Sequence, residues 1–174
     1  MAVNVSVAQF RQADFIATVE QALTEARLPP RLLELEITES LIMDGAEHFI
    51  DKLGRLAKLG VLVSIDDFGT GYSSLSYLKR LPINRLKIDR SFVRDLHDDA
   101  SDAGICRSII AMAHGLGVQA VAEGVETQAQ AAFLRGCGCD HLQGWLFSRA
   151  LEAEPFAELL RIGAFSMLPP AEPK

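Results

Sequence analysis

The sequence of 174 residues is poor in cysteine and in aromatic residues, and it contains neither a basic run nor a long apolar run. Its formal net charge is −6 and no cluster of Lys or Arg stands out. It therefore lacks the positive footprint of a protein that binds duplexes, and we expect no DNA or RNA duplex partner. No stretch is long and apolar enough to cross a bilayer, so we expect no membrane segment.

The few cysteines and histidines exclude other classes of site. Cys106, Cys137 and Cys139 are odd in number and form no Cys-x-x-Cys pair, which favours reduced thiols in a cytoplasmic protein. The N-terminus has neither a cationic segment nor a signal-peptide core. Four histidines lack metal-ligand spacing, and we interpret them as surface or packing residues: His48, His97, His114 and His141.

The remaining sequence alternates short β-branched runs with amphipathic segments. Apolar residues make up 49% and charged residues 23%, which is typical of one globular domain with a core. We expect strands over 3–6, 32–38, 61–66, 85–89, 118–123 and 141–147. We expect helices over 8–27, 45–59, 73–81, about 99–116, 127–135 and 154–162. Each strand is a nearly continuous apolar run, which indicates parallel strands covered on both faces.

The chain is organised around residues 64–74. A predicted buried strand ends there in two adjacent acids, Asp66 and Asp67. A Gly-x-Gly turn follows, and then Ser73 and Ser74, which are suited to cap a helix. Adjacent carboxylates repel each other, and a pair of divalent cations neutralises them well because one carboxylate can bridge two metals. The alternative is that both acids only form a turn and cap a helix.

Polar residues decide the architecture. One such residue interrupts or ends each predicted strand: Asn4, Glu36, Asp66, Lys87, Glu123 and Gln143. An open doubly wound sheet gathers its ligand at one switch point, from only a few strands. A group from every strand can converge only if the strands form a ring, as at the C-terminal face of a βα barrel. Such a barrel needs eight strands in roughly 250 residues, so two units of the ring are missing from the six predicted here.

The converging groups are oxygen donors and a lysine, without histidine or cysteine. Carboxylates and amides are hard ligands, which favour Mg²⁺, Mn²⁺ or Ca²⁺ over zinc. Two hard cations and a lysine suit the attack of water on a phosphodiester. The competing interpretation is that the acids are solvated residues at strand ends.

The sequence resembles the EAL-domain phosphodiesterases, which hydrolyse cyclic di-GMP to linear pGpG. The resemblance extends to about residue 160, with matching order and spacing, and rests on residues 3–6, 36–39, 66–74, 86–89, 122–126 and 143–148. It implies an α/β fold, an incomplete (β/α)8 TIM-like barrel with about six βα units that lacks the first strands. Residues 1–162 would form the truncated domain, and 163–174, rich in proline, a disordered C-terminal tail.

The resemblance also implies roles for individual residues. Metal ligands for Mg²⁺ or Mn²⁺ would be Asn4, Glu36, Asp66, Asp67 and Glu123, with Asp66 as the bridge between the two metals. The catalytic residues would be Lys87, which positions and polarises the attacking water, Glu123 and Glu126. The residues that support the loop and the substrate would be Glu39, Phe68, Gly69, Thr70, Gly71, Asp89 and Gln143. Glu39 would anchor loop 67–74, and that loop would couple dimerisation to metal binding.

Two departures from the family pattern leave two hypotheses open. The Glu-Ala-Leu motif, whose glutamate is a metal ligand, would lie upstream of residue 1, and Ala150 replaces a usual proline. We expect either a truncated phosphodiesterase, natural or an expressed fragment, that is weak or inactive alone, or a non-catalytic module for nucleotide binding, regulation or dimerisation. Unpaired strand edges attract other strands, so we expect a homodimer or larger oligomer.

Overall fold

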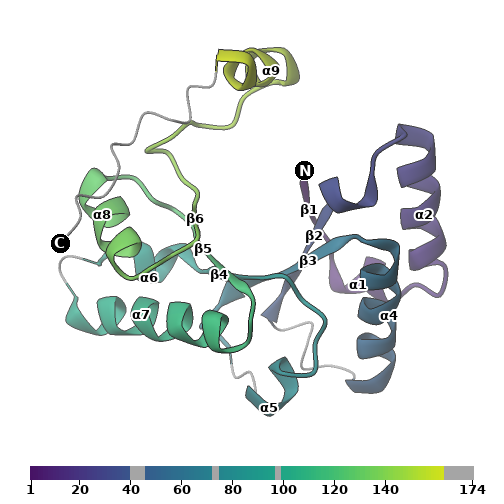
Figure 1. Ribbon diagram of the computed structural model, residues 1–174, viewed down its shortest axis with the longest axis horizontal. Coiled ribbons are helices and arrows are strands. Elements are labelled where there is room, and N and C mark those ends of the chain that lie inside the picture. Colours follow the sequence, from purple (N-terminus) through teal and green to yellow (C-terminus); the bar gives the residue numbers. More distant parts are fainter. Residues whose placement is uncertain (40–45, 72–74, 97–98, 163–174) are drawn as a thin grey trace.

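A computed structural model describes residues 1–39, 46–71, 75–96 and 99–162. These residues form one parallel sheet of six strands, each paired with the next in sequence, with β1 and β6 at its edges (Figure 1). The strands are β1 Ala2–Asn4, β2 Glu34–Thr38, β3 Leu62–Phe68, β4 Arg85–Ile88, β5 Gln119–Ala122 and β6 His141–Leu142. The sheet is curled into part of a ring, which confirms the predicted α/β fold, an incomplete TIM-like barrel.

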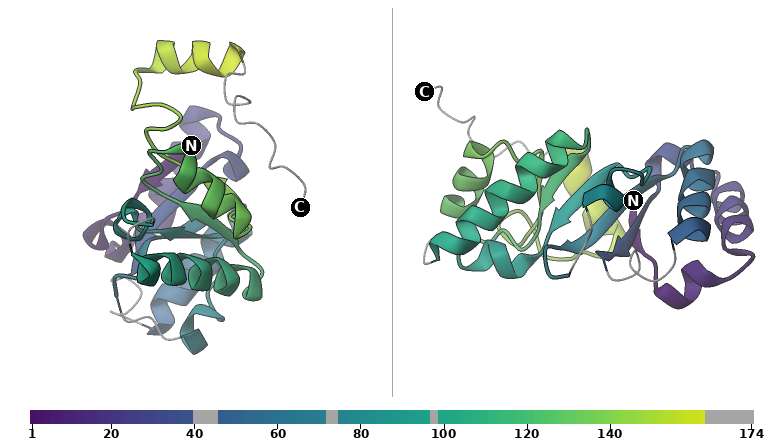
Figure 2. Two further views of the ribbon diagram at one scale, coloured as in Figure 1. Left: turned by 90° about the vertical axis from the view of Figure 1, so that its left-hand side faces the viewer. Right: turned by 90° about the horizontal axis from the view of Figure 1, so that it is seen from below.

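Helices alternate with the strands, and most of them cover the convex side of the sheet, whereas the last described helix stands away from it (Figures 1 and 2). They are α1 Val7–Arg11, α2 Phe15–Ala26, α4 Ala46–Leu59, α5 Leu75–Leu78, α6 Arg90–Arg94, α7 Ala100–Gly115, α8 Gln128–Gly136 and α9 Ala153–Ile162, with a 3₁₀ turn at Pro30–Leu32. Helix α4 packs on β3, and α7 packs on β4 and β5. The helices predicted from about 99 and from 127 are capped at these residues, because Asp99 accepts from the N–H of Ser101 and Thr127 from that of Gln130.

The two faces of the sheet differ in chemistry. Alternate residues of a strand point to opposite faces. The convex face carries the apolar core under the helices, including Leu35, Ile37, Val63, Ile65, Leu86 and Ile88. The concave face carries the polar partners in the alternation, including Glu34, Glu36, Ser64, Asp66, Arg85 and Lys87. The strands are parallel as predicted, but β2, β3 and β4 alternate apolar and polar residues instead of forming nearly continuous apolar runs.

Two predicted elements differ in the structure, and one helix was not predicted. The single helix over 8–27 is two helices, because Gln12 has extended backbone (φ −58°, ψ 140°) and ends α1. The sixth strand stops at Leu142, and the N–H of Leu146 instead bonds the carbonyl of Val125 in the loop after β5. Helix α6 was not predicted; Asp89 caps it by accepting from the N–H of Ser91.

Other predictions lie partly or wholly outside the described residues. These include the Ser73–Ser74 cap, the start of the helix over 73–81 and the tail 163–174, and the domain boundary at 162 stays a prediction. No helix among residues 1–39, 46–71, 75–96 and 99–162 combines the length and apolarity needed to span a membrane.

Candidate metal and phosphodiester site

Lys87 lies at the centre of an acidic cluster on the concave face. It is only 4% exposed. Its Nζ lies 2.7 Å from Glu36 Oε1, 3.0 Å from Asp66 Oδ1 and 2.6 Å from Glu123 Oε1. Three neighbouring strands and the segment after β5 therefore meet at one ammonium group.

Burial and hydrogen bonding have opposing effects on the pKa values of Lys87 and Glu123. Burial by itself lowers the pKa of Lys87, but hydrogen bonds to Glu123 and Glu36 outweigh it and raise that pKa above its usual range. Burial raises the pKa of Glu123, although its contact with Lys87 opposes the rise. One ammonium cannot balance all of the carboxylates around it, so the cluster retains an excess of negative charge.

A bulge in β3 places two consecutive acids at this cluster. Ile65 pairs with Leu86 and Phe68 with Ile88, so Asp66 and Asp67 together lie opposite Lys87 alone. Asp67 has a φ of 53°, in the left-handed region. Carboxylate oxygens of Asp66, Asp67 and Glu123 lie within 4.8 Å of one another. Three hard oxygen donors at this separation form a donor set that fits a divalent cation.

Glu36 and Asn4 reach the site from the neighbouring strands. Glu36 is buried and joins the cluster through Lys87 rather than through the three closely spaced carboxylates. Asn4 is exposed at the end of β1 and is the register partner of Glu36. The structure thus places Asn4 beside a residue of the cluster, on an edge strand.

Asp89 extends the acidic cluster by a carboxyl pair with Asp67. Burial and the Asp66 charge, together with a hydrogen bond to Asp89, raise the pKa of Asp67. Burial by itself raises the pKa of Asp89, but hydrogen bonds from Ser91 outweigh this effect and lower that pKa below its usual value. Asp89 therefore serves both as the cap of α6 and as a support for Asp67.

Glu39 anchors the loop that follows β3. Its carboxylate, 3% exposed, accepts hydrogen bonds from the N–H groups of Gly69 and Gly71, both at 3.1 Å. Thr70 closes the turn by donating its hydroxyl to the carbonyl of Asp67 at 2.8 Å. Gly69 has a φ of 101°, and a Cβ on Gly71 would lie 3.0 Å from the Glu39 carboxyl carbon. Both glycines are thus required by the turn and by its approach to Glu39.

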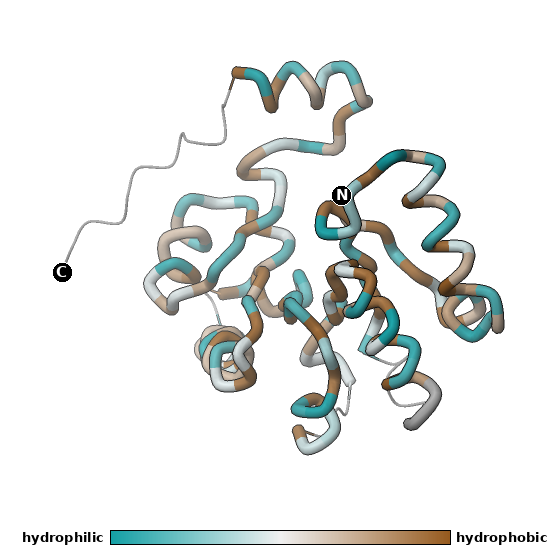
Figure 3. Tube along the Cα trace, turned by 45° about the vertical axis from the view of Figure 1, so that its right-hand side comes forward, coloured by the Kyte–Doolittle hydropathy of each residue, from teal (hydrophilic) through white to brown (hydrophobic). Residues whose placement is uncertain are grey.

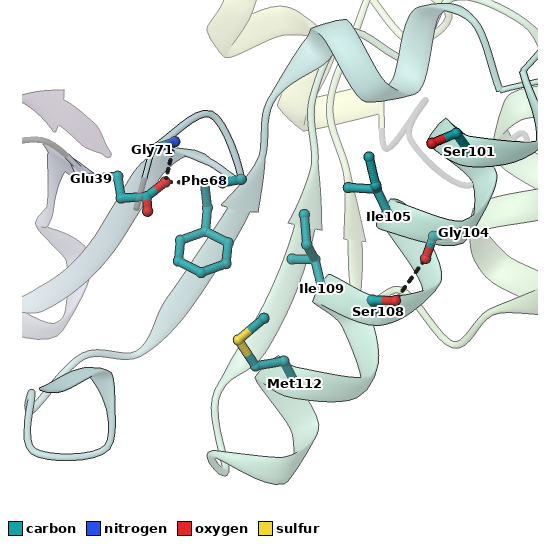
Figure 4. A pocket seen from close by; sticks show the side chains of 10 residues that line it. Glu39, Phe68, Gly71, Ser101, Gly104, Ile105, Ser108, Ile109 and Met112 are labelled. Carbon is teal, nitrogen blue, oxygen red and sulfur yellow. Dashed lines mark hydrogen bonds between the residues drawn. The ribbon is translucent and has the colours of Figure 1, made fainter. Parts of the chain in front are cut away.

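A cavity of about 430 Å³ lies between this loop and α7 (Figure 4). Phe68, which is 5% exposed, and Glu39 form one side of it. Ile105, Ile109 and Met112 of α7 form the other side. The loop that carries Asp67 and helix α7 therefore face each other across a largely apolar cavity.

A second and larger cavity, of about 1130 Å³, opens beside the acidic cluster. Glu123, Glu126 and Gln143 all line it. Trp145 and Arg149 also line it, with the Arg149 guanidinium 4.2 Å from the centre of the Trp145 ring. This cavity combines acidic, basic and aromatic groups next to the possible metal ligands.

A polar layer that was not predicted lies below the cluster, toward the amino ends of the strands. Arg85 forms an ion pair with Glu34, and its Nε donates to Gln119 Oε1 at 3.1 Å. His141 Nε2 lies 3.2 Å from the same oxygen of Gln119. The period-two patterns Glu34-Leu35-Glu36 and Arg85-Leu86-Lys87 were the signal that would have revealed this layer.

The sequence of this chain is similar to those of known proteins. Signaling protein YkoW of Bacillus subtilis is 49% identical over 160 residues, which cover 92% of this chain and 20% of that protein. Cyclic di-GMP phosphodiesterase NbdA of Pseudomonas aeruginosa is 48% identical over 170 residues, 98% of this chain and 22% of that protein. The chain thus spans about a fifth of the length of these relatives.

Solved structures are similar to this chain as well. The PaMucR phosphodiesterase in complex with c-di-GMP gives a TM-score of 0.87 at 49% identity, covering 89% of this chain and 63% of that one. The manganese/cy-diGMP complex of Klebsiella pneumoniae BlrP1 gives 0.78 at 34% identity, covering 85% and 38%. The EAL domain family model matches residues 1–150, and the chain therefore belongs to the EAL domain family.

Proposed function

We propose that this chain is a cyclic di-GMP phosphodiesterase domain that uses two divalent cations, Mg²⁺ or Mn²⁺, to open cyclic di-GMP to linear pGpG. The observation that carries the proposal is the convergence of Asp66, Asp67 and Glu123 within 4.8 Å around Lys87. NbdA is named as a cyclic di-GMP phosphodiesterase, and PaMucR was solved with c-di-GMP. Family and site chemistry therefore point to the same reaction.

The residues that would hold the cations are the acids of the cluster, with Asn4 and Glu36 completing the set from β1 and β2. When bound, such cations neutralise phosphodiester charge and lower the pKa of water. The acidic side chains of the cluster would fix the positions of these cations. Asp66 and Asp67 come from one bulge, whereas Glu123 comes from a different strand end, so the site is fixed by tertiary structure.

Lys87 acts in this arrangement as a hydrogen-bond donor. Its ammonium is held by Glu36, Asp66 and Glu123 and carries its proton, because these contacts raise its pKa. A fixed ammonium is suited to orient a water molecule or to stabilise negative charge that develops on a phosphate oxygen. The burial of Lys87 shields these three contacts from bulk water, where they would weaken.

The larger cavity is suited to the nucleotide. Its volume of about 1130 Å³ exceeds that of many small-molecule pockets and leaves room for a dinucleotide. Arg90 and Arg149 line it and would attract phosphate groups, while Trp145 offers an aromatic surface for a base. Glu126 and Gln143 would contact the substrate or support the ligands from the same cavity.

The test is hydrolysis of cyclic di-GMP by the purified chain in Mg²⁺ and in Mn²⁺, followed by chromatography of the product. We expect slow, metal-dependent formation of linear pGpG, which Asp66→Ala abolishes. Arg94→Ala serves as the control, because its ion pair with Asp95 lies on the surface, away from the cluster. We predict that the hydrolytic activity of this chain alone is weak.

The alternative is a non-catalytic module that binds cyclic di-GMP or regulates another protein. Calorimetric binding of cyclic di-GMP without turnover in either metal would support this alternative over hydrolysis. Loss of that binding in Glu126→Ala, with wild-type binding in Arg94→Ala, would place the nucleotide in the larger cavity.

We further propose that the chain forms a dimer or larger oligomer through its open side. Among the described residues β1 and β6 each pair with one strand only, which leaves two sheet edges. Helix α9 stands away from the sheet and carries hydrophobic residues between hydrophilic ones (Figures 1 and 3). Phe156, Leu160 and Ile162 on it are 47%, 56% and 66% exposed. Apolar surface of this kind marks an interface.

Sedimentation velocity tests the assembly. We expect a dimer or larger species, which Phe156→Glu combined with Leu160→Glu dissociates. A stable monomer of the unmodified chain would contradict the proposal. The three free thiols fit a reducing compartment, and we propose a cytoplasmic location for this domain.

A further inference from the structure

Ser64 occupies an unusual position on the concave face of β3. It is 0% exposed, and among the described residues its hydroxyl is a buried side-chain polar group without a hydrogen-bond partner. An unpaired buried hydroxyl is costly, so an alanine would satisfy the packing at lower cost. The hydroxyl group therefore does not account for a serine at position 64. The other property of this side chain is its small size.

Two ion pairs cross β3 on either side of this serine. Glu34 and Glu36 lie on β2, whereas Arg85 and Lys87 lie on β4, with β3 between the two strands. Ser64 is the register partner of Glu36 on one side and of Arg85 on the other. Both ion pairs therefore cross β3 immediately beside Ser64.

We infer that Ser64 is a positioning residue whose small side chain leaves the space in which Lys87 reaches Glu36 across β3. The inference rests on the proposed function for its catalytic consequence, because Lys87 is then held at the metal cluster by this contact. A larger side chain at 64 occupies that space. Interiors are densely packed, so the added volume displaces the long, adaptable Lys87 and Arg85 side chains first.

The experiment compares two substitutions that separate size from the hydroxyl. Ser64→Ala removes the hydroxyl at nearly constant size, and Ser64→Val adds volume on the concave face. Val63→Ile adds volume to the adjacent residue on the convex face and controls for overpacking alone, since Val63 belongs to the apolar core. Mn²⁺ affinity by calorimetry, unfolding midpoint in urea, kcat and KM are measured for each.

We expect Ser64→Ala to keep Mn²⁺ affinity and kcat within about threefold of wild type, because size is conserved. We expect Ser64→Val to weaken Mn²⁺ binding and to lower kcat by about tenfold or more, with little change in KM. KM is spared because Ser64 does not line the larger cavity. Val63→Ile should lower the urea midpoint while it leaves Mn²⁺ affinity unchanged.

A crystal structure of Ser64→Val measures the contact directly. We expect Lys87 Nζ to leave its position 2.7 Å from Glu36 Oε1. Retention of that contact, or an equal loss of Mn²⁺ affinity in Ser64→Ala, overturns the inference. If the unmodified chain does not hydrolyse cyclic di-GMP, the proposed function fails while the structural and Mn²⁺ comparisons still decide the role of Ser64.

Discussion

The carboxylates of Asp66 and Asp67 converge although the two residues are consecutive, with oxygen atoms within 4.8 Å of each other. In a regular strand their side chains would point to opposite faces of the sheet. The bulge between Ile65 and Phe68 and the positive φ of Asp67 remove that alternation. The site thus obtains two acids from one strand end at the cost of a strained backbone residue.

Substitutions at Asp67 should separate charge from backbone strain. Asn tolerates the left-handed region, so Asp67→Asn should keep the fold while Mn²⁺ binding weakens by about tenfold through the lost charge. Asp67→Val should in addition lower the free energy of unfolding by about 1–2 kcal/mol, since a β-branched residue resists this φ. Calorimetry and urea unfolding measure the two effects. Equal stability of the two variants would contradict the assigned strain.

Removal of the Glu39 carboxylate should loosen the loop after β3. Glu39→Ala leaves the N–H groups of Gly69 and Gly71 without their acceptor and should destabilise the fold by about 1–3 kcal/mol. Glu39→Gln keeps an acceptor oxygen and should cost less. Hydrogen exchange at the two glycine amides should rise in the alanine variant, and unchanged exchange would rule out the anchoring role.

Asp140 should make stability depend on pH. Burial raises its pKa, but the N–H of Ala120 at 2.8 Å and His114 at 2.9 Å outweigh this and hold the pKa below its usual value. A lowered folded pKa contributes stability above the unfolded pKa, near 4, and that stability is lost as the pH falls through the folded pKa.

The matching variant is Asp140→Asn. Because the Asp140 side chain is partly solvated, we expect the free energy of unfolding of this variant at pH 7 to be only about 0.5–1 kcal/mol below that of the wild type. The difference should shrink between pH 7 and pH 2, because the wild-type carboxylate loses its charge as the pH falls through its folded pKa. Urea unfolding at both pH values measures it. A gap that widens in acid would contradict the sign of the shift.

The three cysteines should differ in reactivity. Burial raises the pKa of Cys106 to about 12 and, against opposing hydrogen bonds, that of Cys139 to about 11. Cys137 is only partly buried. In the native protein at pH 8, a disulfide reagent should therefore modify Cys137 first, whereas all three thiols should react in denaturant. Rapid native modification of Cys106 would show that α7 opens readily.

Many features of the fold followed from the sequence because they depend on local pattern. The alternation of strands and helices, the helix starts near 99 and 127, and the polar residue near each strand end are readable from neighbouring residues. The spacing of the motifs also indicated the family. Residue type and short-range periodicity are sufficient for these features, because they arise within one turn or one strand.

Only the tertiary structure decided which groups meet. The register between β3 and β4 sets the bulge at Asp66 and Asp67, and no residue in either strand encodes that register alone. The same register brings Lys87 to three carboxylates and Arg85 to Glu34. Contacts across a strand depend on the pairing of segments distant in the chain, so the sequence determined the elements and their chemistry, whereas packing of the sheet determined the site.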